Sequence, residues 1–165
     1  MLAAGSTHQR DGTEMSGHEA SFYIETYGCQ MNSADSALVE QLLLRAGFGK
    51  AAEAGEADVV LLNTCTVRGH AESRIYGRFR QLLALRGKRP HLVLGMLGCL
   101  AQHHGGKLFA ELPFLDVVAG PDSYRRLPAM LVAALQDRRQ PGRLLDVRLD
   151  RGETYADLPA GTELA

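Results

Sequence analysis

The sequence predicts an α/β fold: an open, mostly parallel sheet of four to five strands with helices on both faces, a three-layer sandwich of the flavodoxin or Rossmann type. Two continuous apolar runs, within 58–63 and 91–97, are bounded by polar residues. Such runs are typical of strands buried on both faces, as in a parallel sheet. Strand-like and helix-like segments also alternate along the chain, which favours right-handed crossovers between parallel strands.

Each expected strand rests on a short apolar or β-branched segment. The first, Ser21–Tyr27, reads Ser-Phe-Tyr-Ile-Glu-Thr-Tyr, which is aromatic and β-branched. The fifth predicted strand, 144–149, is the least regular and could equally be an extended linker. The predicted strands are 21–27, 58–63, 91–97, 115–119 and 144–149.

The segments between them carry apolar residues at helical spacing. In the first, Ala34, Leu38 and Leu42 share one face, Asn32 or Ser33 can act as N-cap, and Gly47 can end the helix. In the second, the inner stripe is Ala71, Ile75, Phe79 and Leu82 or Leu83. The predicted helices are 32–46, 69–86, 102–112 and 122–135.

The 165 residues predict one domain over 21–149, a disordered tail over 1–20, and a linker over 150–165. The net charge of −1 gives no general affinity for nucleic acid. The apolar runs are too short to cross a membrane, and the first twenty residues lack a signal peptide. Three cysteines, an odd number, argue against a secreted disulfide framework, so we expect a cytoplasmic protein.

The three cysteines occupy equivalent positions. Cys29, Cys65 and Cys99 each lie one or two residues beyond a predicted strand, and Gly28 and Gly98 precede two of them. Neighbouring parallel strands are about 4.8 Å apart, and ligands bind beyond the carboxyl ends of such strands. We therefore expect the three thiols to converge at one edge of the sheet, where glycine allows a bulky ligand to approach.

Three readings of this convergence stay open on the residues alone. Three thiolates can hold a cubane iron–sulfur cluster and leave one iron open to another ligand. A zinc site would recruit histidine from His70, His103 or His104, although a surface position is preferred for His103 and His104. The cysteines could also be small buried packing residues without metal. No glycine-rich phosphate-binding loop is present.

Polar residues flank the cysteines and form a second set of candidates. They could donate hydrogen bonds to a bound cluster or substrate, or they could cap loops. Arg68 could meet an anionic substrate. Arginines 74, 78 and 80 are expected on a solvated helix face rather than in an RNA-binding patch. Besides Arg68, the candidates for contact with the bound group are Gln30, Asn32, Asn63 and Thr64.

At these residues the sequence resembles the N-terminal domain of the methylthiotransferases, radical-SAM enzymes that insert and methylate sulfur. The similarity covers roughly 21–135, with a further match at 153–157. It rests on motifs whose order and spacing are specific. These are Tyr-Ile-Glu-Thr-Tyr-Gly-Cys-Gln-Met-Asn at 23–32, Asn-Thr-Cys-Thr-Val-Arg at 63–68, Tyr-Gly-Arg at 76–78, Leu-Gly-Cys-Leu-Ala-Gln at 97–102 and Gly-Pro-Asp at 120–122.

The resemblance implies that Cys29, Cys65 and Cys99 ligate an auxiliary 4Fe–4S cluster with one open iron. Gln30 and Met31 are similar to the tRNA-modifying MiaB branch, which methylthiolates isopentenyl-adenosine beside the anticodon. The alternative is the branch that modifies a ribosomal protein.

The family's radical-SAM motif Cys-x-x-x-Cys-x-x-Cys does not occur in this sequence. The second cluster, S-adenosylmethionine and the RNA-binding domain are therefore expected outside it. We expect this fragment to be monomeric and inactive alone, with tRNA bound through the absent domains and the radical-SAM domain in cis.

Overall fold

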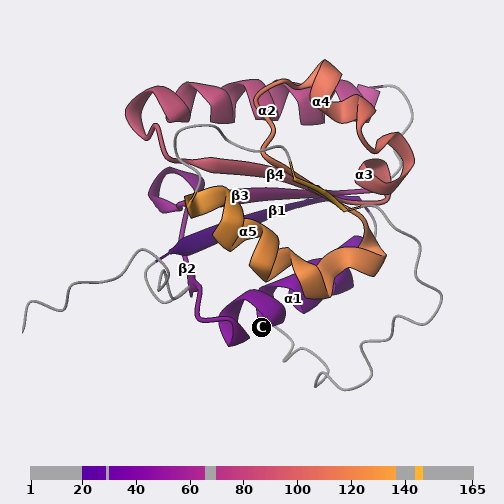
Figure 1. The fold of residues 1–165 in the computed structure, drawn as a ribbon. Helices are drawn as coiled ribbons and strands as arrows, with labels where there is room; N and C mark the ends of the chain where they lie inside the picture. The colour runs from indigo at the N-terminus through magenta and orange to yellow at the C-terminus, as the bar shows by residue number, and fades with distance from the viewer. Residues whose placement is uncertain (1–19, 29, 66–69, 137–143, 147–165) are drawn as a thin grey trace, which may run out of the picture.

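The computed structural model describes residues 20–28, 30–65, 70–136 and 144–146. Within these ranges the strands form one parallel sheet in the order β2-β1-β3-β4-β5-β6 (Figure 1). This confirms the predicted α/β class and its parallel sheet. The strands are β1 Ser21–Tyr27, β2 Gly49–Lys50, β3 Val59–Thr64, β4 Val93–Gly98, β5 Val117–Ala119 and β6 Leu144–Asp146.

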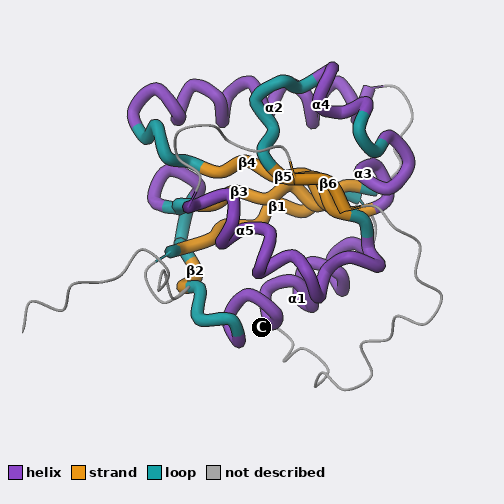
Figure 2. Tube along the Cα trace, viewed as in Figure 1, coloured by secondary structure: helices purple, strands orange, loops and turns teal. Residues whose placement is uncertain are grey.

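Helices cover both faces of the sheet, as Figure 2 shows. On one face lie α2, α3 and α4; on the other lie α1 and α5. Two 3₁₀ helices, Ala54–Glu56 and Pro121–Arg126, complete the described elements. The α-helices are α1 Gln30–Arg45, α2 His70–Lys88, α3 Cys99–His104, α4 Lys107–Glu111 and α5 Leu127–Gln136.

The central strands β3 and β4 are buried along their whole length. Alternate side chains enter the two cores, because successive residues of a strand point to opposite faces. Val60 and Leu62 pack beneath α2, whereas Val59 and Leu61 pack against α1 and α5. The continuous apolar runs of the sequence are thus explained by helices on both sides.

The predicted inner stripe of α2 is confirmed at Ile75, Phe79 and Leu82, all of which are buried. Leu83, the alternative to Leu82, is 38% exposed. At the amino edge of the sheet, Arg86 forms an ion pair with the buried Asp116, and it donates hydrogen bonds to the backbone oxygens of two neighbouring segments. This end of the molecule is therefore fastened by ionic contacts.

Several boundaries differ from the predictions. Helix α1 begins at Gln30, so Asn32 is a buried residue inside the helix and not its N-cap. The two-residue strand β2 lies where no strand was expected, and β6 is described over Leu144–Asp146, while the rest of the predicted strand 144–149 lies outside the described residues. Backbone pairing with β1 creates β2, and a two-residue segment carries no periodic signal.

The helix expected over 102–112 is in fact two helices. Helix α3 already begins at Cys99 and ends at His104, and Gly105, with a φ of 52°, then reverses the chain before α4. Residues 122–126, which were expected to begin the helix over 122–135, belong instead to the 3₁₀ helix Pro121–Arg126. No helix among the described residues is long and apolar enough to cross a membrane. The predicted tail over 1–20 lies outside the described ranges except for Ala20, which is buried in the core and so does not belong to a disordered tail. The predicted linker over 150–165 lies outside the described ranges.

Candidate functional site

The strands that precede the three cysteines are neighbours in the sheet, in the order β1-β3-β4. Their last residues are level with one another, because Tyr27 pairs with Thr64 and Thr64 pairs with Gly98. Cys65 follows β3 directly, and Cys99 is the first residue of α3, directly after β4. Cys29 itself lies outside the described residues. Cys65 and Cys99 therefore lie at one edge of the sheet, and Tyr27 and Gly28, which precede Cys29 in the sequence, end at the same edge.

Gly28 and Cys65 are in direct contact at this edge. The Cys65 amide donates a hydrogen bond of 3.1 Å to the Tyr27 carbonyl oxygen, which continues the β1–β3 ladder by one residue. A Cβ atom built on Gly28 would lie only 2.7 Å from Cys65 Sγ, and Gly28 has a φ of 139°. The Cys65 sulfur therefore occupies the space that a side chain at position 28 would fill. Gly28 is also the residue that directly precedes Cys29.

Gly98 makes a similarly close approach between β4 and β3. Its φ of 94° lies in a region that side-chain-bearing residues rarely adopt. A Cβ atom there would overlap the Thr64 carbonyl oxygen and would lie 2.5 Å from Asn63 Oδ1. Because neither glycine has a side chain, neighbouring atoms can approach the backbone closely at the residue that precedes each of these two cysteines.

The described thiols are open to a ligand. Cys65 is half-buried and Cys99 is exposed. Among the described residues, which do not include Cys29, no three His, Cys, Asp or Glu side chains come close enough to hold a metal ion. The donor set and the glycine-lined edge suit a soft, thiolate-bound group. His103 is exposed and contacts the ring of His104, with centroids 5.3 Å apart.

The polar residues beside the cysteines fall into two groups. Asn32, Asn63 and Thr64 are buried, whereas Gln30 is exposed and Arg68 lies outside the described residues. Asn63 Nδ2 donates to the Asn32 backbone oxygen at 3.0 Å, and to a serine hydroxyl of α1 at 2.9 Å. Thr64 Oγ1 donates to the Leu97 carbonyl oxygen at 3.3 Å. These bonds fasten the first turn of α1 and the end of β4 to β3; contact with a bound group stays a prediction.

An ionic network beside this edge was missed by the sequence analysis. Arg78 of α2 donates hydrogen bonds to both carboxylate oxygens of Glu25 on β1. The Tyr27 hydroxyl donates to the same carboxylate at 2.8 Å. Arg78 is therefore not a freely solvated cation, and that expectation was wrong. Arg74 and Arg80 are exposed, as expected.

The network shifts two proton affinities. Burial, together with the hydrogen bond to Glu25 and the charge of Glu25, raises the pKa of Tyr27 to about 12. The hydrogen bond to Glu25 raises the pKa of Arg78 above its usual value. Both groups therefore stay protonated at neutral pH. The sequence contained one indication of the contact between Arg78 and Glu25. Side chains of a strand alternate between the two faces of the sheet, which places Glu25 and Tyr27 together on the face that α2 covers.

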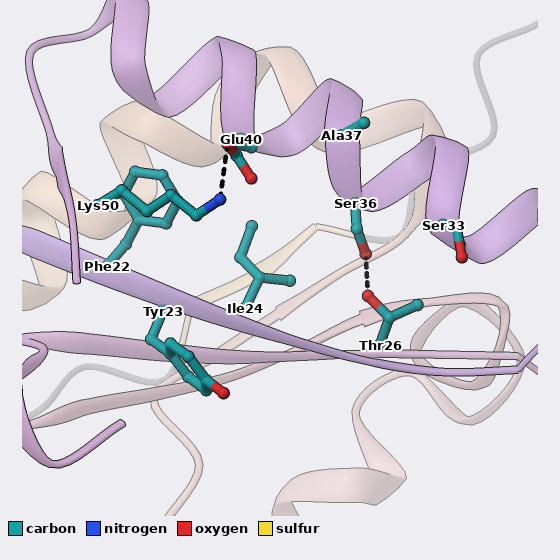
Figure 3. Close-up of a pocket in the computed structure, with 9 residues that line it drawn as sticks. All are labelled: Phe22, Tyr23, Ile24, Thr26, Ser33, Ser36, Ala37, Glu40 and Lys50. Atoms are coloured by element: carbon teal, nitrogen blue, oxygen red, sulfur yellow. Dashed lines mark hydrogen bonds and ion pairs between the residues drawn. The ribbon is translucent and has the colours of Figure 1, made fainter. Parts of the chain in front are cut away.

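A separate cavity of about 270 Å³ lies between α1 and the outer edge of β1 (Figure 3). One end approaches the cysteine edge, where Thr26 and Ser36 share a 2.7 Å hydrogen bond between hydroxyls. The other end is bounded by the ion pair of Glu40 with Lys50, at 3.0 Å. The remaining lining residues are Phe22, Tyr23, Ile24, Ser33 and Ala37.

Comparisons with known proteins identify the family of this chain. Residues 21–120 match the family described as "Uncharacterized protein family UPF0004". A protein named tRNA-2-methylthio-N(6)-dimethylallyladenosine synthase from Chlorobium luteolum is 44% identical over 137 residues, which cover 83% of this chain and 30% of the relative. The mitochondrial tRNA methylthiotransferase CDK5RAP1 of Rattus norvegicus is 40% identical over 151 residues, which cover 89% of this chain and 25% of the relative.

The chain therefore spans less than a third of the length of these relatives. The family match covers both described cysteines and the strands that place them at one edge. The chain belongs to the UPF0004 family, the N-terminal domain of the methylthiotransferases.

Proposed function

We propose that this domain holds a 4Fe–4S cluster through Cys29, Cys65 and Cys99, and that the full-length protein methylthiolates tRNA. One observation carries the cluster proposal. The Cys65 sulfur lies against Gly28, the residue before Cys29, and Gly98, the residue before Cys99, pairs with Thr64, the residue before Cys65. Bound there, the cluster would supply an iron with an open coordination position for a sulfur species or substrate.

The residues of this chain have separate parts in that function. The exposed Cys99 and half-buried Cys65 supply thiolates without unfolding of the edge. Gly28 leaves space for the Cys65 sulfur, and Gly98 leaves space for the Thr64 backbone and the Asn63 side chain beside Cys99. The buried amide of Asn63 holds the start of α1, and with it the segment that carries Cys29.

The substrate proposal rests on the relatives. The names of the bacterial and rat proteins specify tRNA, which favours the tRNA branch over the ribosomal-protein branch. For the full-length protein we propose a radical-SAM domain in cis, a second 4Fe–4S cluster and S-adenosylmethionine, with tRNA bound through domains beyond this one. A cytoplasmic location is proposed from the sequence alone; the rat relative is named as mitochondrial.

The test is anaerobic reconstitution of the 165-residue chain with iron and sulfide. Wild type should take up about four irons per chain and gain a broad absorbance near 400 nm. Cys65→Ala and Cys99→Ala should lose both signals, whereas His103→Ala, an exposed side chain beyond the thiols, should keep them. Because the core lies on either side of the sheet, each apo cysteine variant should unfold within about 1 kcal/mol of wild type.

Two results would contradict the proposal. Uptake of zinc in place of iron, lost in His103→Ala, would assign a cysteine–histidine zinc site. Absence of any metal, with slow alkylation of every thiol, would leave an α/β domain whose cysteines are packing residues.

A further inference from the structure

Helix α3 carries Cys99 as its first residue but is only six residues long. A helix of this length has little stability of its own, so its orientation depends on tertiary contacts. Its N-terminus has no side-chain cap. Leu100 and Ala101 are buried in the core beneath α2, which anchors one side of the helix. A contact on another side is needed to fix its rotation about its own axis.

Gln102 makes that contact, at the carboxyl end of β5. Its Oε1 atom is buried. A Cβ atom built on Gly120 would overlap this oxygen and would lie 2.9 Å from the Gln102 Cδ. The carboxamide therefore occupies the space left by the missing side chain of Gly120. Gln102 is three residues after Cys99, so both side chains lie on neighbouring sides of the same helical turn.

Gly120 offers Gln102 a fixed surface. Its amide donates to the Asp146 carbonyl oxygen at 2.9 Å, and its own carbonyl oxygen accepts from the Ser123 amide at 3.0 Å. The φ and ψ angles of −81° and 170° are ordinary extended values that any residue adopts. The need for glycine at this position therefore comes from Gln102 and not from the backbone.

We propose that Gln102 is a positioning residue: its carboxamide, seated on Gly120, fixes the rotation of α3 and so the direction of the Cys99 thiol. The functional meaning rests on the proposed cluster site, because a ligand that bridges three loops needs each thiol in a fixed place. The positioning itself can be measured without a cluster. It assigns a role to two motif residues that bear no metal-binding atoms.

The test is a double-mutant cycle in the full 165-residue chain, with Gly120→Ala, Gln102→Ala and the double variant. The readout in the apo protein is the alkylation rate of Cys99 relative to Cys65, resolved by peptide mass spectrometry. Gly120→Ala should expel the carboxamide and loosen α3, which raises this ratio by at least about threefold. Gln102→Ala should raise it similarly, and the double variant should match Gln102→Ala.

Gly87→Ala is the matched control, because a Cβ atom at Gly87 would meet nothing within 4 Å. It should leave the ratio unchanged. After reconstitution, Gly120→Ala should hold less than about half of the wild-type iron, and Gly87→Ala all of it.

Three results would overturn the positioning role. They are an unchanged ratio in Gly120→Ala, equal acceleration of Cys65 and Cys99, or an effect of Gly120→Ala that persists in the absence of Gln102. Wild-type protein without iron would refute the cluster proposal instead, and the apo ratio would still decide the positioning role.

Discussion

Replacement of Gly98 by alanine should destabilise the domain and disturb the edge that carries Cys99. Gly98 ends β4 with φ and ψ of 94° and −162°, which only glycine adopts readily. The added Cβ atom would overlap the carbonyl oxygen of Thr64. That oxygen belongs to the backbone of the buried strand β3, so it cannot move aside as a flexible side chain could.

The two contributions can be added approximately. A non-glycine residue in this backbone region costs about 1–3 kcal/mol. Overpacking against a rigid neighbour costs about 1–3 kcal/mol more. We therefore expect the free energy of unfolding to fall by about 4 kcal/mol, the middle of the summed range of about 2–6 kcal/mol. For a chain of this size, a loss of about 4 kcal/mol corresponds to a decrease in Tm of about 8–16 °C.

The assay is urea unfolding of the apo chain, followed by circular dichroism. Gly77→Ala is the matched control, because Gly77 lies inside α2 and a Cβ atom there meets nothing within 4 Å. The control should gain about 0.5–1 kcal/mol, since alanine favours the helix. A Gly98→Ala variant within about 0.5 kcal/mol of wild type would refute the claim that only glycine fits at the end of β4.

Three further outcomes follow from other contacts. Arg86→Ala should lower the free energy of unfolding by about 2–4 kcal/mol in a urea titration, because the carboxylate of Asp116 then stays buried without its cation. A loss below about 0.5 kcal/mol would contradict a stabilising role of this ion pair. The raised pKa of Tyr27, about 12, predicts stability that is complete below pH 10 and is lost as the pH rises through 12. The difference in 295 nm absorbance between wild type and Tyr27→Phe should therefore titrate near pH 12, and titration near pH 10 would disprove the shift. Asn63→Ala should cost about 1–3 kcal/mol in the same urea assay, because it removes two hydrogen bonds that the buried Asn63 side chain donates to α1. Unchanged stability would show that these bonds do not hold the helix.

Local patterns were sufficient for most of the fold. The apolar runs that became β3 and β4 identified strands buried on both faces, and the stripe through Ile75 and Phe79 identified the buried side of α2. These signals are local, since burial repeats with the period of the element itself. Helix boundaries were less well predicted. Gly105 divides α3 from α4 through a positive φ that the sequence permits but does not require.

For Cys65 and Cys99, the sequence predicted the position at the sheet edge but not the contacts, and the position of Cys29 stays a prediction. A cysteine after each of three strands, with alternating helices, is enough to place all three at one edge once the strands are neighbours. Arg78 shows the limit of this reasoning. Its partner Glu25 is 53 residues away in sequence and approaches only after α2 packs across the sheet. A helix pattern gives the face on which a cation lies, but not which carboxylate meets it.

The sequence by itself determined the alternation of strands and helices, the burial of the central strands, and the position of each cysteine just beyond a strand. Only the tertiary structure decided the order β2-β1-β3-β4-β5-β6, the contact of the Cys65 sulfur with Gly28, and the seat of Gln102 on Gly120. The physical reason is the separation along the chain of the residues that interact. Periodic burial is encoded within a few consecutive residues, whereas close packing joins residues whose separation in the chain carries no periodic signal.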